Sequence, residues 1–115
     1  MIYLAIPYTF NAELSFKIAN KIAAQLMNDG EIVFSPISHS HVISDELDPS
    51  LRYSQEFWLK QDLAFLAMCE KVVAVLIGDK GIELLAKSKG CTTELDYAKE
   101  YGIPVQFVKY HLDAD

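Results

Sequence analysis

The segment Lys71-Val-Val-Ala-Val-Leu-Ile77 is the most strand-like stretch of the chain, because three valines stand among its apolar residues. An uninterrupted apolar run of this length is typical of a strand that is buried on both faces, as the strands of parallel sheets are. Met1-Ile-Tyr-Leu-Ala-Ile6 is a second run of this kind, and Pro7 ends it. The two segments predict strands of a parallel sheet, with the first strand at its centre.

Helical patterns separate the predicted strands. An apolar residue recurs every four positions from Leu14 to Leu26, which predicts a helix that Asn11 caps and that ends near Gly30. The same signals predict helices over residues 54–69 and 92–101, and further strands over residues 32–34 and 105–109. Strands that alternate with helices favour right-handed crossovers. We therefore predict an α/β protein, a flavodoxin-like three-layer sandwich whose small parallel sheet has the order 2-1-3-4.

Two segments lack a regular pattern, residues 37–53 and residues 78–90, although a turn of helix is expected at 82–86. Long irregular segments inside compact domains are usually functional. The first segment follows the second strand at the ligand-binding end of the sheet and carries His39, His41 and Arg52 among its polar residues. We predict that it forms a lid over the substrate.

Composition limits the kind of protein. A chain of 115 residues, 51% hydrophobic and 23% charged, suits one packed domain spanning residues 1–115. A net charge of −6 argues against a nucleic-acid polymer as partner. The apolar runs are far shorter than the roughly 20 residues that a membrane span requires, and no signal segment opens the chain. Two cysteines without a paired framework indicate reduced thiols, so a cytoplasmic protein is expected.

Two carboxylates are candidates for chemistry. Glu94 falls in the first turn of the helix predicted from Thr92, where an acid complements the helix dipole. This position is common for a stabilising surface acid, yet it would also keep the carboxylate ionised, as a nucleophile requires. Asp62 lies at the margin of an apolar helical stripe, where a carboxylate is either on the wet edge or turned toward a cavity. Cys91, near the same helix start, ranks below Glu94 as a nucleophile because no histidine partner is assured.

Other polar and aromatic residues leave alternatives open. The short spacing of His39 and His41 lacks a third metal ligand at a recognised distance, so a substrate-contacting segment without metal is the better interpretation. Arg52 could bind a phosphate or an acidic neighbour. Tyr8 and Trp58 could stack on a base or fill the core.

Several short motifs gain weight from their order and spacing. A glycine stands four residues before a helical glutamate, and apolar strands precede both. The motifs are Ile2-Tyr-Leu-Ala5, Phe34-Ser-Pro36, Trp58 with Asp62-Leu63, the strand 72–77, Ser88-x-Gly90 and Glu94-Leu-x-Tyr-Ala98. In this combination the chain resembles the nucleoside 2-deoxyribosyltransferase-like superfamily over nearly its whole length, and small uncharacterised members most of all.

The resemblance implies an enzyme that cleaves the N-glycosidic bond of a nucleotide or nucleoside and needs neither metal nor organic cofactor. The residue matching Glu94 would attack the anomeric carbon and form a covalent sugar intermediate. The residue matching Asp62 would contact the sugar or help protonate the departing base. The motifs Phe34-Ser-Pro36 and Ser88-x-Gly90 would bring Pro36 and Gly90, with Ser88, into contact with the substrate.

The chain departs from the superfamily in three respects. Transferases of this group carry an aspartate where Ser88 stands, whereas the nucleotide hydrolases resemble the chain, with a serine that holds a 5′-phosphate. The loop Ile6-Pro-Tyr-Thr9 lacks the glycine-and-arginine phosphate loop of those hydrolases, and a fifth strand is missing after residue 109. A 5′-monophosphate substrate and a homodimer with a shared active site are expected. The alternative is a catalytically silent nucleotide-binding module of the same fold.

Overall fold

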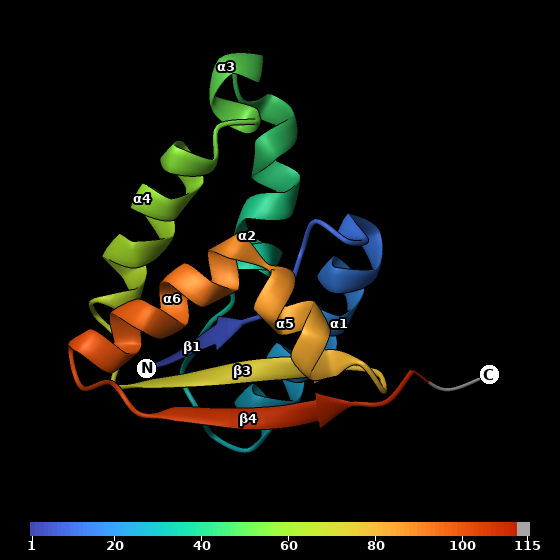
Figure 1. Cartoon of the computed structure of the whole chain (residues 1–115), viewed down its shortest axis with the longest axis vertical. Coiled ribbons are helices and arrows are strands. Elements are labelled where there is room, and N and C mark those ends of the chain that lie inside the picture. Colours follow the sequence, from blue (N-terminus) through green and yellow to red (C-terminus); the bar gives the residue numbers. More distant parts are fainter. Residues whose placement is uncertain (113–115) are drawn as a thin grey trace.

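The computed structural model describes residues 1–112. It contains a sheet of β1 (Ile2–Ala5), β2 (Val33–Phe34), β3 (Lys71–Ile77) and β4 (Val105–Tyr110), in the order β2-β1-β3-β4 (Figure 1). Every neighbouring pair of strands is parallel. The predicted parallel sheet and its order are therefore confirmed, and each strand begins and ends within one residue of the expected bounds.

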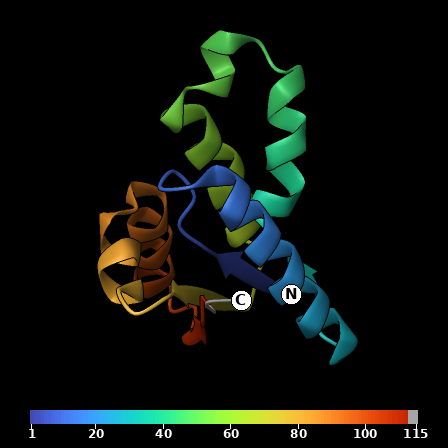
Figure 2. The ribbon, with the colours of Figure 1, turned by 90° about the vertical axis from the view of Figure 1, so that its right-hand side faces the viewer.

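Helices cover both faces of the sheet, which gives three layers (Figure 2). Alternate strand residues point to opposite faces, so Ile2 and Leu4 pack with the buried side of α1 (Ala12–Asn28). Tyr3 and Ala5 belong to the second core cluster, on the other face. That cluster includes buried residues of α4 (Gln55–Leu66), α5 (Gly81–Lys87) and α6 (Lys89–Glu100). The alternation of the first strand thus decides which helices Tyr3 can meet.

Side chains cap three of the helices. Asn11 Oδ1 accepts the backbone N–H of Leu14 at 3.2 Å, and the hydroxyl oxygen of Ser54 accepts that of Phe57 at 3.1 Å. Both caps confirm the helix starts predicted from the sequence. Ser88 caps α6, which therefore begins at Lys89 and not near Thr92. The predicted start was wrong because the cap serine lies one turn earlier than the Thr-Thr pair suggests.

The predicted loop over residues 37–53 is also wrong, because this segment is mostly helical. It forms α2 (Pro36–Ile43), a 3-10 turn η1 (Ser44–Glu46) and α3 (Pro49–Arg52), with a proline in the first turn of each α-helix. The Arg52 guanidinium donates from Nε to the Ser44 carbonyl and from Nη2 to the Asp45 carbonyl, both at 2.7 Å. We call α2, η1 and α3 the helical arm; it projects beyond the sheet together with the start of α4 (Figures 1 and 2).

The segment 78–90 is likewise more helical than expected, since α5 occupies most of it. α5 starts at Gly81, whose position allows no side chain: an added Cβ would lie 2.8 Å from the Leu76 carbonyl carbon. This close approach holds α5 against the end of β3 and so places Ser88 and the start of α6.

Within residues 1–112, none of the helices has the length and apolar character needed to cross a membrane.

Candidate active site

Glu94 is buried on the inner face of α6, with 6% of its surface exposed. Its Oε2 accepts a hydrogen bond from the hydroxyl of Tyr3, a fully buried residue of β1. In the sheet register Tyr3 is level with Phe34, where the two-residue strand β2 ends. The Tyr3–Glu94 pair therefore lies under α6, level with the carboxyl end of β2.

Burial governs the protonation of this pair. Burial raises the pKa of Glu94 to about 8. The hydrogen bond from Tyr3 lowers this pKa in part, and the charge of Asp62 raises it slightly further. Burial, and then the charge of Glu94, also raises the pKa of Tyr3 far above its ordinary value. The expectation of an ionised acid in a first helical turn is wrong: because α6 starts at Lys89, Glu94 lies in its second turn and is enclosed by the core.

Asp62 is a half-buried carboxylate on α4, which packs against α6. Burial raises its pKa to about 6, and its charge in turn raises the pKa values of Glu94 and Tyr3. The two carboxylates thus belong to one electrostatic unit with separated pKa values, an arrangement that suits different roles for two acids.

The start of α6 gives Ser88 and Cys91 local structural roles. The hydroxyl oxygen of Ser88 accepts the backbone N–H of Cys91 at 3.2 Å, and a side-chain hydrogen bond from Ser88 partly offsets the effect of burial on the pKa of the Cys91 thiol. Burial, followed by the charge of Glu94, raises the pKa of Cys91 to about 12. Burial of the thiol in the core therefore outweighs the lowering of its pKa that a position near a helix N-terminus would produce.

Aromatic rings from four elements form a continuous row of contacts that begins at the Tyr3 ring. Phe34 of β2 and Phe65 of α4 stack with ring centroids 4.1 Å apart, and the Tyr3 ring lies 6.1 Å from Phe34. The His39 ring lies 5.4 Å from Phe34 and 5.8 Å from Phe65. We call Phe34, Phe65 and His39 the aromatic wall. It runs from the buried carboxylate to the exposed surface at His39.

The other predicted site residues make no hydrogen bond with Glu94 among the described residues. Arg52 binds backbone carbonyls of the helical arm, and the Trp58 indole N–H donates to the Arg52 carbonyl at 2.8 Å. Pro36 is buried at the first position of α2, whereas Gly90 has open space where a side chain would be. The Tyr8 hydroxyl is hydrogen-bonded to His41, which lies two residues after His39 on α2.

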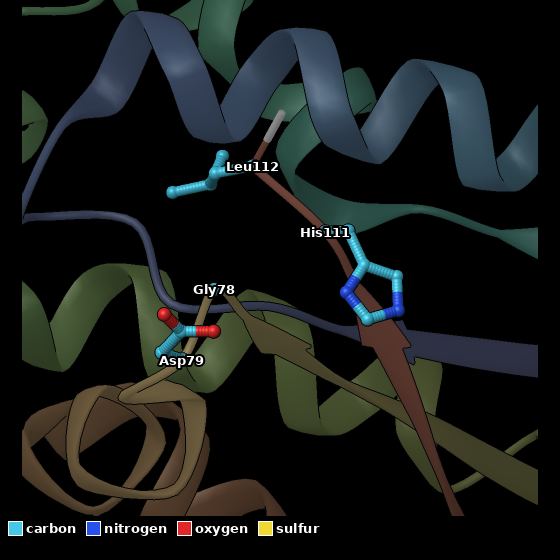
Figure 3. A pocket seen from close by; sticks show the side chains of 4 residues that line it. All are labelled: Gly78, Asp79, His111 and Leu112. Atoms are coloured by element: carbon cyan, nitrogen blue, oxygen red, sulfur yellow. The ribbon is translucent and has the colours of Figure 1, made fainter. Parts of the chain in front are cut away.

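Neither of two cavities among the described residues is lined by Glu94 or Asp62. One, of about 310 Å³, lies after β3 and β4 and is lined by Gly78, Asp79, His111 and Leu112 (Figure 3). The other, of about 420 Å³, lies between α1, β2 and α2, and Phe34, Ser35 and His39 help to line it. The second cavity thus reaches the aromatic wall, while Glu94 is closed to solvent in this structure.

Tyr3 is the residue that reasoning from the sequence missed. A lone tyrosine inside an apolar strand was a usable signal, because a buried phenol needs a hydrogen-bond partner. The partner itself, 91 positions away, is not visible in the local sequence.

The raised pKa of Glu94 makes the stability of the protein depend on pH. Between the ordinary value of 4.5 and about 8 the folded state holds a proton that the unfolded state has lost. The free energy of unfolding should therefore fall as the pH rises through this window, by at most about 1.4 kcal/mol per pH unit, and level off above it. Denaturant titrations should show that Glu94→Gln flattens this slope. Glu100→Gln, an exposed acid on the same helix, should leave it unchanged; equal slopes in all three proteins would contradict the assignment.

A four-stranded parallel sheet in the order 2-1-3-4, with helices on both faces, defines an α/β protein with a flavodoxin-like fold. The fold is shared with a 2-deoxyribosyltransferase from the psychrotolerant bacterium Bacillus psychrosaccharolyticus, at a TM-score of 0.65 and 24% sequence identity. The alignment covers 99% of this chain and 75% of that protein. The resemblance expected from the sequence is confirmed at the level of the fold. The chain belongs to the DUF1937 family, a domain of unknown function, whose model matches residues 1–110. No curated protein matches the chain significantly.

Proposed function

We propose that the protein cleaves the N-glycosidic bond of a nucleoside or nucleoside 5′-monophosphate and transfers the sugar to water or to a second base. The observation that carries this proposal is the buried Glu94, held by Tyr3 and coupled to a second carboxylate with a different pKa. The shared fold supports it, because the similar protein from B. psychrosaccharolyticus is named a 2-deoxyribosyltransferase.

The two carboxylates divide the work of one displacement. An oxygen of ionised Glu94 attacks the anomeric carbon as the bond from that carbon to the base nitrogen breaks. The electron pair of the broken bond stays on the base, and Asp62 supplies the proton that neutralises it. Water or a second base then attacks the anomeric carbon of the glutamyl ester, gives up its proton to Asp62, and releases the Glu94 carboxylate.

Tyr3 acts as a positioning residue in this scheme. Its hydroxyl donates to one Glu94 oxygen, Oε2, and so leaves the other oxygen for attack. The same bond partly offsets the desolvation that raises the pKa of Glu94, which favours the ionised nucleophile.

The closed position of Glu94 requires that a covering element moves when substrate binds. The helical arm and α4 are suited to this, because the arm carries His39 of the aromatic wall and α4 carries both Phe65 and Asp62. The arm thus takes the place of the predicted lid, as a helical segment and not as a loop.

Release of free base from a panel of nucleosides, deoxynucleosides and their 5′-monophosphates tests the proposal most directly. Chromatography should detect base, and adding a second base should reveal transfer as a new nucleoside. Binding of a nucleotide without base release, by the wild type and Glu94→Gln alike, would instead support the silent binding module.

Ser88 is expected to favour a phosphorylated substrate, since a hydroxyl can donate to a phosphate oxygen and the start of α6 attracts anions. Ser88→Asp keeps a side chain that can cap the helix and adds a negative charge that repels a phosphate. Its kcat/KM for the monophosphate should fall by at least tenfold while that for the nucleoside stays nearly unchanged. Equal use of both substrates by the wild type would refute the phosphate assignment.

A homodimer belongs to the same proposal. The helical arm exposes Val42, Ile43 and Leu51, and Tyr53 directly after it is 79% exposed, so a second copy could bury an apolar surface there. Light scattering of a protein that turns over nucleotide should give twice the monomer mass, and an active strict monomer would rule the dimer out.

A further inference from the structure

A carboxylate, an imidazole and a phenol form a hydrogen-bonded chain beside the loop that follows β1. The Tyr8 hydroxyl lies 2.6 Å from His41 Nδ1, and His41 Nε2 lies 3.0 Å from Glu13 Oε1. The three residues come from that loop, from α2 and from the first turn of α1. Phe16 stacks on the imidazole with ring centroids 4.3 Å apart, which holds the plane of the ring.

The chemistry of the three groups decides the direction of both hydrogen bonds. An ionised carboxylate only accepts hydrogen bonds, so the contact with Glu13 places the proton of a neutral His41 on Nε2. The Nδ1 atom is then an acceptor, and the Tyr8 hydroxyl must donate to it. The Tyr8 hydroxyl can therefore only accept a hydrogen bond from another molecule, through the lone pairs of its oxygen.

Tyr8 occupies a place where such an acceptor can meet a ligand. Tyr8 is half-buried and lies in the loop after β1, and β1 lies between β2 and β3 in the sheet. Open α/β sheets bind ligands outside the carboxyl ends of the strands at this kind of reversal in strand order.

We propose that Glu13 and His41 fix the Tyr8 hydroxyl as a hydrogen-bond acceptor, and that this acceptor selects ligands by a hydrogen-bond donor. Tyr8 is then a specificity-determining residue, and Glu13 and His41 are positioning residues. The inference rests on the proposed function for the nature of the ligand. In a nucleoside or nucleotide the available donors are sugar hydroxyls and exocyclic amino groups of the base, whereas a phosphate oxygen without a proton is excluded from this position.

The first test needs no ligand. Nitrogen-15 NMR of the histidines in the alkaline range, above the ordinary imidazole pKa of about 6.5, should show His41 as the Nε2–H tautomer. Glu13→Ala should turn this single tautomer into a mixture, and Glu46→Ala, at an exposed acid of η1, should not. A proton on Nδ1 in the wild type, or no effect of Glu13→Ala, would overturn the inference.

The second test compares ligands that differ by one donor. Affinities should be measured for a parent nucleoside and for its sugar O-methyl derivatives. They should also be measured for two nucleosides whose bases differ only in that one carries an exocyclic amino group where the other carries a carbonyl. Wild type should bind one derivative about 3-fold to 10-fold more weakly than its parent, which identifies the sugar or the base as the source of the donor. Tyr8→Phe should bind the parent and that derivative equally well. Tyr101→Phe, at an exposed tyrosine after α6, should behave as wild type.

The outcomes separate this inference from the proposed function. If base release depends on Glu94 but Tyr8→Phe and wild type show the same ligand preference, only the role of Tyr8 is overturned. A wild type that binds no nucleoside contradicts the proposed function and the selection by Tyr8, while the tautomer in the free protein still decides the positioning by Glu13 and His41.

Discussion

Glu94→Gln is expected to lower the rate of base release by about 10⁴-fold to 10⁶-fold while the protein stays folded and binds nucleotide. Glutamine keeps the size of the side chain and can still accept the Tyr3 hydrogen bond, but its amide does not form the glycosyl ester. Single-turnover base release, followed by chromatography, measures the loss. Wild type incubated with a slow 2-fluoro sugar analogue should also gain the mass of the sugar within residues 90–99.

Two further results make this prediction specific. Glu100→Gln changes an exposed acid on the same helix and should retain full activity. An active Glu94→Gln protein would overturn the mechanism, and a sugar adduct on another residue would move the nucleophile to that residue.

Asp62→Asn should lower the release of ordinary bases by about 10²-fold to 10⁴-fold, the usual contribution of a general acid. An N7-methylated purine nucleoside supplies an internal control, because its base already carries a positive charge and leaves without a proton. In a single turnover, before the glutamyl ester is cleaved, Asp62→Asn should therefore release the methylated base at nearly the wild-type rate. Equal losses for both substrates would show that Asp62 holds the sugar and does not protonate the base.

The pH profile provides a second signature of the same pair. Activity requires ionised Glu94, with a pKa of about 8, and protonated Asp62, with a pKa of about 6. The form with both groups in these states is on the order of 1% of the free enzyme near neutral pH. As the pH increases, kcat/KM should rise up to about pH 6, stay level up to about pH 8, and fall at higher pH. In Asp62→Asn the break near pH 6 should vanish, so that kcat/KM rises until about pH 8. A variant that keeps the break near pH 6 would assign that pKa to another group.

Most of the fold could be predicted because its signals are local. The apolar runs of β1 and β3, the four-residue spacing in α1 and the caps Asn11 and Ser54 each depend on neighbours within a few positions. The helical arm could not be predicted in the same way. It projects from the sheet and buries few apolar residues, so it has no sustained hydrophobic period, and Arg52 holds it through backbone carbonyls that no sequence pattern records.

Asp62 and Glu94 were identified as candidates from the sequence, whereas their protonation was decided by the tertiary structure. Residue type, spacing and the resemblance to a family are properties of the chain itself, and they sufficed to predict a parallel α/β sheet with two carboxylates as candidates. Burial beneath α6, the hydrogen bond from Tyr3 and the nearby charge of Asp62 exist only after residues distant in sequence meet. A pKa depends on the exclusion of water and on charges acting through space, which is why only the folded chain shows Glu94 to be a buried acid with a raised pKa.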